Sequence, residues 1–211
     1  MALLDKKEIE ELVQRMMEAY PDARCALDHG DRFQLLVAVV LSAQTTDVSV
    51  NKVTPALFAK APDAFAMAAM PEEEISEIIR TIGMYRTKAH NVKALSAALV
   101  EKYDGEVPGD YDRLVELPGV GRKTANVVLA EAFGQQRIAV DTHVFRLANR
   151  IGLVCEKDVV KTEEGLMKVL PEDHWTAMHH ALIWHGRRVC TARKPDCENC
   201  CIEGVCRRNG L

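Results

Sequence analysis

The chain has 211 residues, enough for one large domain or two compact ones, and its 48% hydrophobic content supports an ordinary buried core. Its net charge of −4 on its own argues weakly against nucleic-acid binding, but the charge is uneven. Residues 185–211 carry six Arg or Lys against three acids, so this tail is +3 and the remainder is −7. No apolar run reaches the roughly 18 residues that a membrane span needs, which argues against a transmembrane protein.

The first twenty residues predict an amphipathic helix and not a secretion signal. Ile9, Leu12, Val13 and Met16 recur at helical spacing, acids come early, and no small-residue cleavage site follows. We therefore expect a cytoplasmic protein. In a reducing cytosol the seven cysteines favour a metal or redox cluster over disulfides.

Nearly every periodic segment predicts a helix, so the expected fold class is all-α. Arg32–Ser42 is apolar on almost every side, which predicts a fully buried helix. Thr46 or Asp47 is expected to cap the helical segment Thr45–Lys60, in which Pro55 would open a new turn or helix. The other expected helices are Pro71–Ile82, Tyr85–Tyr103, Asp110–Leu117, Lys123–Phe133, Thr142–Ile151, Asp158–Leu170 and Glu172–Val189.

The stretch LPGVGRKTANVV predicts two helices joined by a tight glycine turn. Gly119 and Gly121 can adopt positive φ and let another backbone approach closely. Arg122 and Lys123 stand at the start of the second helix, where unpaired N–H groups and the helix dipole already attract anions. These features predict a helix-hairpin-helix that binds the DNA backbone without reading its sequence. A plain helix–turn–helix corner is the alternative.

The stretch CTARKPDCENCCIEGVC places four cysteines at C-x6-C-x2-C-x5-C spacing. Four thiolates within seventeen residues suit one tetrahedral metal ion or one iron–sulfur cubane. Zinc is the chemical alternative, although the uneven gaps fit a zinc ribbon poorly; disulfides come third. Arg193 and Lys194 lie in the first gap and are expected to contact phosphate. The four predicted ligands are Cys190, Cys197, Cys200 and Cys206.

The remaining cysteines and the C-terminal histidines are not expected to bind metal. Cys201 is expected to point away from the site, and Cys25 and Cys155 to be small buried hydrophobic residues. Four histidines scatter over several helix faces and are interpreted as packing or partly solvated residues. They are His174, His179, His180 and His185.

Lys123 and Asp141 form the candidate reactive pair. An amine nucleophile must lose its proton; burial and the neighbouring Arg122 charge would favour the neutral form, whereas a carboxylate opposes it. Asp141 is therefore expected to accept a proton and to stabilise a developing sugar cation. Lys123 is expected to attack C1′ of a sugar and form a Schiff base, the usual use of an activated lysine. The alternative is a surface lysine that only touches phosphate.

The sequence resembles the endonuclease III family, bifunctional DNA glycosylases and AP lyases of the helix-hairpin-helix superfamily. The likeness rests on LSAQTTD, LPGVGRKTANVV, AVDTHVFR and the cysteine tail, and spans almost the whole chain. It implies a six-helix domain, 25–135, and a discontinuous domain, 1–24 and 136–211, that holds a [4Fe–4S] cluster. DNA would lie in a cleft between the two domains.

The resemblance also implies an activity in base excision repair. Oxidised or ring-saturated pyrimidines would be flipped out of the duplex and removed, and the strand would be cleaved 3′ to the abasic site by β-elimination. Lys123 would be the nucleophile, Asp141 the essential aspartate, and the four cysteines the cluster ligands. The implied partner is damaged double-stranded DNA. The protein would act as a monomer without an obligate protein partner, at the bacterial nucleoid.

Three further DNA contacts follow from the resemblance. Gln44 would fill the hole left by the flipped base; its alternative role is an amide that satisfies a helix end. Met84 stands where the family usually presents leucine and would act as a second, more flexible wedge. His143 would orient Asp141 or touch phosphate, or else pack at a helix start.

Two other classes share part of this pattern. Adenine mismatch glycosylases resemble the hairpin and the cluster, but they lack a lysine at the Lys123 position and carry a further C-terminal domain, whereas this sequence ends soon after Cys206. A non-catalytic DNA-binding or redox-sensing iron–sulfur protein needs neither Lys123 nor Asp141.

Overall fold

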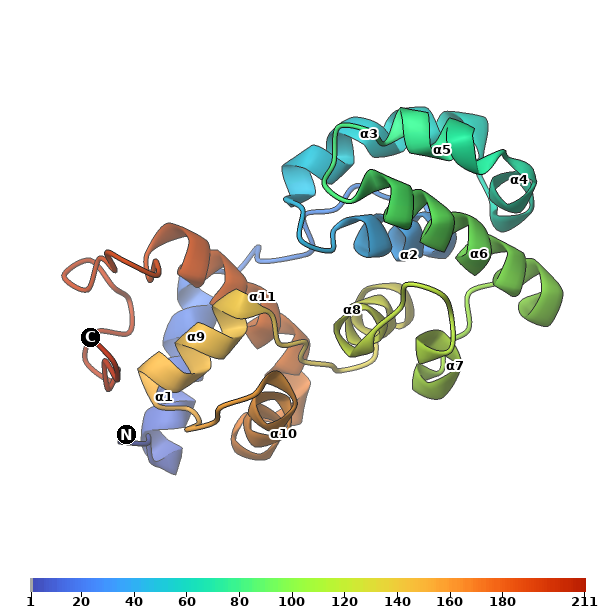
Figure 1. Ribbon diagram of the computed structural model, residues 1–211. Coiled ribbons are helices and arrows are strands. Elements are labelled where there is room, and N and C mark those ends of the chain that lie inside the picture. The colour runs from blue at the N-terminus through green and yellow to red at the C-terminus, as the bar shows by residue number, and fades with distance from the viewer. Residues whose placement is uncertain (1) are drawn as a thin grey trace. The chain divides into compact units, whose positions relative to one another are not determined.

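The computed structural model describes residues 2–211, which form eleven α-helices, one 3-10 helix and no strand (Figure 1). The all-α prediction is confirmed. The chain divides into two compact units: unit 1 takes the N-terminal residues up to Cys25 together with Gln136–Leu211, and unit 2 is Ala26–Gln135. Within the described residues, no helix has the length and apolarity required to cross a membrane.

Unit 2 is a bundle in which the apolar helix α2 is enclosed by its neighbours. Asp31 caps α2 by accepting a hydrogen bond from the backbone N–H of Gln34 at 2.8 Å, and the segment Leu35–Leu41 is buried throughout. Helices α3, α6 and α8 all pack against α2, as its apolar surface on every side requires. The helices of unit 2 are α2 (Arg32–Leu41), α3 (Asp47–Lys60), α4 (Ala64–Ala69), α5 (Glu72–Ile78), α6 (Tyr85–Tyr103), α7 (Tyr111–Val115) and α8 (Arg122–Phe133).

The expectation that Pro55 opens a new helix is wrong, because α3 runs through it without interruption. A proline inside a helix removes one backbone hydrogen bond, but here Val50, Val53 and Leu57 keep one face of α3 buried. Thr46 is the cap of this helix, and its hydroxyl accepts from the N–H of Ser49 at 3.3 Å. Burial of the apolar face therefore outweighs the lost bond.

Two other differences arise where helical segments are short. The sequence did not predict α4, which has only six residues and begins at a cap made by Asp63. The segment expected at Pro71–Ile82 is helical only to Ile78, although Ile79 and Ile82 in the following turns are also buried. The apolar residues continue at helical spacing past the end of α5, and for this reason the predicted helix was too long.

Unit 1 packs the first helix of the chain against helices from its C-terminal third. A capping box between Asp5 and Glu8 starts α1. The segment expected as one helix, Glu172–Val189, is a 3-10 turn followed by α11, and the turn itself follows Pro171. The helices of unit 1 are α1 (Lys6–Ala19), α9 (Thr142–Ile151), α10 (Val159–Val169), η1 (Glu172–His174) and α11 (Trp175–Arg188).

Both ends of the chain are tied to the C-terminal end of α9. The N–H of Leu4 donates to the carbonyl of Gly152 at 2.9 Å, and the N–H of Arg207 donates to that of Ile151 at 3.0 Å. Gly152 adopts φ +95°, and a Cβ there would lie 2.7 Å from the carbonyl oxygen of Ala2. These contacts fix the last cysteine of the chain relative to α9.

The two isolated cysteines do not lie where they were expected. Cys155 is exposed and Cys25 is half-buried, so neither is a fully buried hydrophobic residue. Both follow a helix or turn end instead of lying on a core-facing helix. Loop positions of this kind carry no periodic burial signal.

The enclosed position of α2 makes a direct prediction. Leu36→Ala should lower the free energy of unfolding by roughly 2–5 kcal/mol, because it removes a fully buried side chain and leaves a cavity. Urea denaturation followed by circular dichroism would measure this loss as a lower midpoint with an unchanged slope. The same substitution at the exposed Leu3 should leave the midpoint within a few tenths of a molar.

Candidate nucleic-acid interface and cysteine site

The turn between α7 and α8 requires glycine at one position and tolerates other residues at the second. Gly119 has φ +76°, and a Cβ at this position would lie 3.0 Å from the Cβ of Asn91 on α6. Gly121 has φ −97° and ψ 179°, an extended conformation, and a Cβ there would meet no atom within 4 Å. Of the two glycines expected to adopt positive φ, only Gly119 does so. The sequence pattern GxG does not specify which glycine turns the chain.

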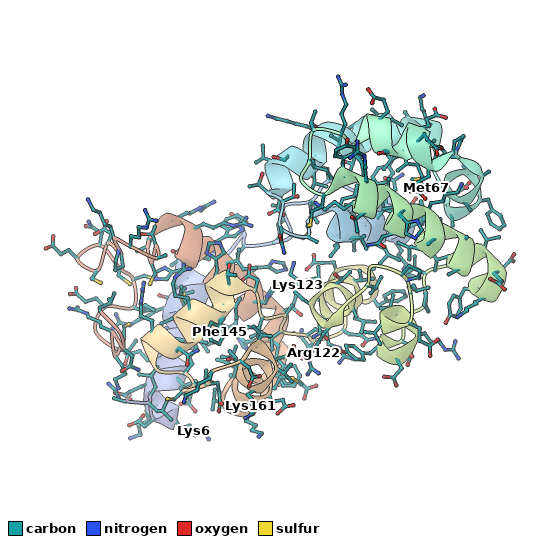
Figure 2. All side chains as sticks on the ribbon, viewed as in Figure 1. Lys6, Met67, Arg122, Lys123, Phe145 and Lys161 are labelled. Atoms are coloured by element: carbon teal, nitrogen blue, oxygen red, sulfur yellow. The ribbon has the colours of Figure 1, made fainter. Side chains whose placement is uncertain are left out.

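Lys123 and Arg122 occupy the first turn of α8 and are exposed (Figure 2). No side chain caps this helix, since Gly121 stands at the N-cap position. Among residues 2–211, Lys123 makes no hydrogen bond or ion pair with another side chain. An accessible amine at an uncapped helix start is well placed to meet an anionic ligand.

Asp141 is the N-cap of α9. Its Oδ1 accepts hydrogen bonds from the backbone N–H groups of His143 and Val144, each at 2.8 Å. Its Oδ2 has no partner among the described residues. One carboxylate oxygen therefore anchors the side chain while the other remains available for proton transfer, and an aspartate directly before a periodic segment is the usual sign of such a cap.

His143 is half-buried behind Asp141. Burial, followed by the charges of Arg146 and Arg187, lowers the pKa of His143, whereas the Asp141 carboxylate opposes that shift. Its Nδ1 lies 3.3 Å from the guanidinium of Arg146. The neutral imidazole is thus favoured, which fits a role in packing near Asp141 better than a role as a phosphate-binding cation.

Gln44 and Met84 share an unusual backbone conformation. Both are non-glycine residues in the left-handed region, with φ 52° and φ 56°, and both are exposed. The side chain of Gln44 makes no hydrogen bond within residues 2–211, so the alternative role of satisfying a helix end is not observed. Backbone outliers of this kind concentrate at functional sites.

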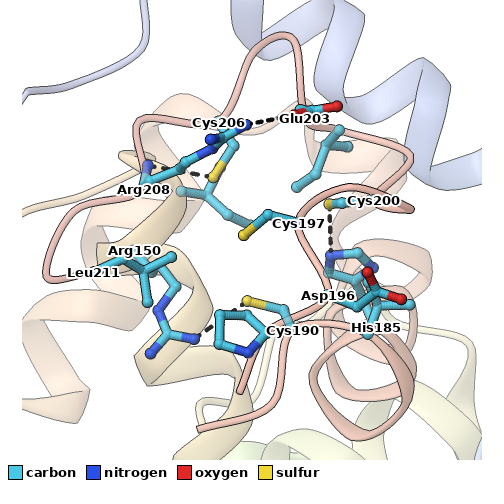
Figure 3. Close-up of a pocket in the computed structure, with 14 residues that line it drawn as sticks. Arg150, His185, Cys190, Asp196, Cys197, Cys200, Glu203, Cys206, Arg208 and Leu211 are labelled. Carbon is cyan, nitrogen blue, oxygen red and sulfur yellow. Dashed lines mark hydrogen bonds and ion pairs between the residues drawn. The ribbon is translucent and has the colours of Figure 1, made fainter. Parts of the chain in front are cut away.

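The four predicted cysteine ligands line one pocket in unit 1 (Figure 3). Their sulfur atoms face a common space whose walls include Ile151 and Ile202. Cys201 does not line this pocket and packs instead against the core of unit 1. No group of three His, Cys, Asp or Glu side chains within the described part of the chain lies close enough to hold a single metal ion.

Polar groups lie within hydrogen-bonding distance of three of the four sulfurs. The buried guanidinium of Arg150 donates to the Sγ of Cys190 at 3.4 Å, and the N–H of Arg208 donates to the Sγ of Cys206 at 3.4 Å. The Nε2 of His185 lies 3.5 Å from the Sγ of Cys200. Contacts of this kind are typical of the surroundings of cysteine ligands to a bound metal group.

Of the two roles expected for the C-terminal histidines, packing and not partial solvation applies to three of the four. His179, His180 and His185 are buried, and His185 also shares a 2.7 Å hydrogen bond with the hydroxyl of Tyr20 on α1. Neither His185 nor Arg150 was predicted to approach the cysteines. Arg150 lies on α9 and His185 on α11, and only the folded structure brings both to the pocket of the cysteines.

Arg193 and Lys194 are exposed in the loop between Cys190 and Cys197. Arg150 holds the start of this loop by donating to the carbonyls of Thr191 at 2.9 Å and of Ala192 at 3.3 Å. The hydroxyl of Thr191 donates to the carbonyl of Lys194 at 2.6 Å and closes the turn. The two cations are therefore presented by an internally bonded loop.

Comparisons with known proteins agree with this geometry. Residues 37–172 match the model of the family described as HhH-GPD superfamily base excision DNA repair protein. The chain is 47% identical to endonuclease III of Bacillus subtilis, over 97% of this chain and 94% of that protein. It is also 47% identical to endonuclease III of Escherichia coli, over 96% of each chain.

Solved structures give the same result. One described as a trapped endonuclease III–DNA covalent intermediate is 48% identical and superposes with a TM-score of 0.93, over 98% of this chain and 97% of that one. A thermostable thymine-DNA glycosylase, at 24% identity and a TM-score of 0.86 over 96% of each chain, shares the fold.

The cap at Asp141 predicts different outcomes for two substitutions. Asp141→Asn keeps a side-chain oxygen for the N–H groups of His143 and Val144 and should change the free energy of unfolding by only a few tenths of a kcal/mol. Asp141→Ala removes the cap and should cost about 0.5–2 kcal/mol. Chemical denaturation of the three proteins would measure both effects, and equal losses in both variants would contradict the assigned cap.

Proposed function

Because the chain belongs to the endonuclease III family of HhH-GPD base excision DNA repair proteins, we propose that Lys123 is the nucleophile of its reaction. The protein is a DNA glycosylase and AP lyase that acts on damaged DNA. The observation that carries the assignment is an exposed lysine without a partner, at the uncapped start of the helix that follows the glycine turn. Its substrates are oxidised or ring-saturated pyrimidines.

The reaction proceeds through bond changes at the sugar. The neutral amine of Lys123 attacks C1′, and the bond from C1′ to the base breaks with its electron pair leaving on the base, which then takes up a proton. Ring opening gives a protonated Schiff base between Lys123 and the sugar. Loss of a proton from C2′ then expels the 3′ phosphate by β-elimination, and water releases the lysine.

Asp141 is the proton acceptor and electrostatic partner in this proposal. Its Oδ2 lacks a partner, so it can take the proton that the lysine ammonium must lose before attack. The resulting negative charge also stabilises the cation that develops at the sugar. Lys123 belongs to unit 2 and Asp141 to unit 1, so DNA must contact both units for the two residues to act together.

The remaining contacts bind DNA without performing chemistry. The hairpin around Gly119, with Gly121 and Arg122, holds the phosphate backbone, and Arg193 and Lys194 provide a second cationic contact. Gln44 and Met84 enter the duplex where the damaged base leaves it, and their exposed left-handed turns support this role. His143 packs behind Asp141.

We propose that Cys190, Cys197, Cys200 and Cys206 hold a [4Fe–4S] cluster. The sulfurs share one pocket, and polar groups of Arg150, His185 and Arg208 lie within hydrogen-bonding distance of three of them. The four cysteines would supply the thiolate ligands of the cluster, and a zinc ion held by the same four thiolates is the chemical alternative. When bound, the cluster supplies a rigid cross-link that fixes the loop of Arg193 and Lys194.

The substrate also bears on assembly and location. The relatives include endonuclease III in complex with DNA, which supports duplex DNA as the partner of this chain. We propose that the protein acts as a monomer, because one copy supplies both residues of the reactive pair. The similar endonuclease III proteins come from bacteria and the substrate is DNA. We therefore propose that this protein acts in the cytoplasm, at the nucleoid.

Borohydride trapping tests the nucleophile. The wild-type protein should become covalently attached to a duplex that holds an abasic site or an oxidised pyrimidine, because borohydride reduces the Schiff base to a stable amine. Lys123→Gln should form no adduct while retaining most of its affinity for the damaged duplex. Gel electrophoresis of the protein–DNA adduct measures the result.

Two further variants sharpen the trapping experiment. Lys102→Gln removes an exposed lysine from the last turn of α6 and should leave trapping unchanged. Asp141→Asn keeps the cap and should slow turnover on the order of 10²–10⁴-fold. An adduct that persists in Lys123→Gln would show that another amine is the nucleophile, and an unchanged rate in Asp141→Asn would refute the role of the carboxylate.

Chemical analysis tests the cysteine assignment. The purified protein should contain iron and acid-labile sulfide in equal amounts and absorb broadly in the visible range. Cys197→Ser should lose both, whereas Cys201→Ser, which alters the neighbour outside the pocket, should keep both. Zinc in place of iron, or loss of iron in Cys201→Ser, would contradict the proposed ligand set.

A further inference from the structure

Lys88 is a lysine buried inside unit 2. Only 3% of its surface is exposed, and its ammonium donates to the hydroxyl of Thr45 at 2.5 Å. No other side-chain partner occurs among residues 2–211. Burial lowers the pKa of Lys88, as expected for a cation removed from water. A buried ammonium with one neutral partner is costly, so its position calls for a physical explanation.

The hydrogen bond joins two turns that are far apart in the sequence. Thr45 directly follows Gln44, between α2 and α3, and Lys88 lies in the first turn of α6, where its N–H donates to the carbonyl of Met84 at 3.0 Å. Gln44 and Met84 are two of the four non-glycine residues with left-handed backbone among residues 2–211, and both are exposed. Lys88 therefore connects the turn that presents one of them to the helix start that presents the other.

We propose that Lys88 is a positioning residue that holds the Gln44 and Met84 turns in a fixed mutual geometry, so that both side chains enter the damaged duplex together. This inference rests on the proposed function, which places Gln44 and Met84 at the DNA. Neither side chain is buried in the protein, so burial cannot hold either turn in place. A directional hydrogen bond between the two turns supplies that constraint.

The same helix also supports the glycine turn of the hairpin. Asn91, less than one turn after Lys88, lies directly under Gly119, where even a Cβ would come within 3.0 Å. Helix α6 thus carries Met84 at its start, the bond to the Gln44 turn through Lys88, and the contact to the hairpin. The side chain of Lys88 is the one polar link from α6 to the Gln44 turn within the described residues.

The test removes each end of the bond and measures the distortion of the duplex. Lys88→Met and Thr45→Val delete the donor and the acceptor with little change in shape, and Thr45→Ser retains the hydroxyl. Stopped-flow fluorescence of 2-aminopurine beside a lesion reports the entry of side chains into the duplex. We expect this step and single-turnover excision to slow by roughly tenfold in the first two variants, because a displacement of even 1 Å can cost that much.

Binding to undamaged duplex should change less than about twofold in all of these variants, because phosphate contacts dominate nonspecific affinity. Thr45→Ser should restore both rates to near the wild-type values. The double variant Lys88→Met/Thr45→Val should be no slower than either single variant, since both remove the same bond.

Lys93 provides a matched control on the same helix. Its ammonium donates to the backbone carbonyls of Ala68 and Met70, so it ties α6 to the C-terminal end of α4 and not to the Gln44 turn. Lys93→Met should lower the melting temperature without slowing the fluorescence step. If both lysine variants slow that step in proportion to their loss of stability, Lys88 is a structural residue and the inference is wrong.

The outcomes separate this inference from the proposed function. If the wild-type protein forms a borohydride adduct and Lys88→Met leaves the fluorescence step unchanged, the inference fails while the proposed function stands. If the wild-type protein distorts the duplex in a Lys88-dependent step but never forms an adduct, the chemistry assigned to Lys123 fails and the positioning role stands. If the wild-type protein does neither, both are wrong.

Discussion

The start of an α-helix leaves backbone N–H groups unpaired and carries a partial positive charge, and this protein uses three such starts in three ways. In α9 the N–H groups are satisfied by one oxygen of Asp141, which fixes the direction of the other. In α8 no side chain caps the helix, and cations stand where an anion can join them. In α6 the preceding residue, Met84, is left-handed and exposed. Each helix start thus sets the position of side chains to which the proposal assigns a role in DNA binding or in the reaction.

Buried polar side chains fix loops that lie outside these helix starts. Arg150 holds the cysteine loop from α9, and Lys88 holds the Gln44 turn from α6. His185 does the same for Cys200 while it is itself fixed by Tyr20. In each case a charged or polar group gives up hydration for a directional contact, a cost that apolar packing would avoid. The gain is a fixed geometry for loops whose exposed residues are proposed to contact DNA.

The sequence was sufficient for features that depend on local signals. Tyr85–Tyr103 and Thr142–Ile151 form helices with the predicted bounds at both ends, because the first has a long apolar period and the second lies between a capping aspartate and a glycine. It was insufficient where tertiary packing decides. Nothing local distinguishes the buried Lys88 from an exposed lysine, or tells which glycine of GVG takes positive φ. The pairing of His185 with a cysteine likewise depends on how α11 meets the cysteine segment.

The discontinuity of unit 1 has a consequence for synthesis on the ribosome. The apolar face of α1, with Leu12 and Met16 fully buried in the finished fold, packs against helices encoded in the last third of the chain. Ala26–Gln135 forms a compact unit with its own core and can fold as soon as it emerges. Until those C-terminal helices are synthesised, α1 has no helix to pack against. The nascent chain therefore exposes an amphipathic segment with an apolar face until translation is almost complete.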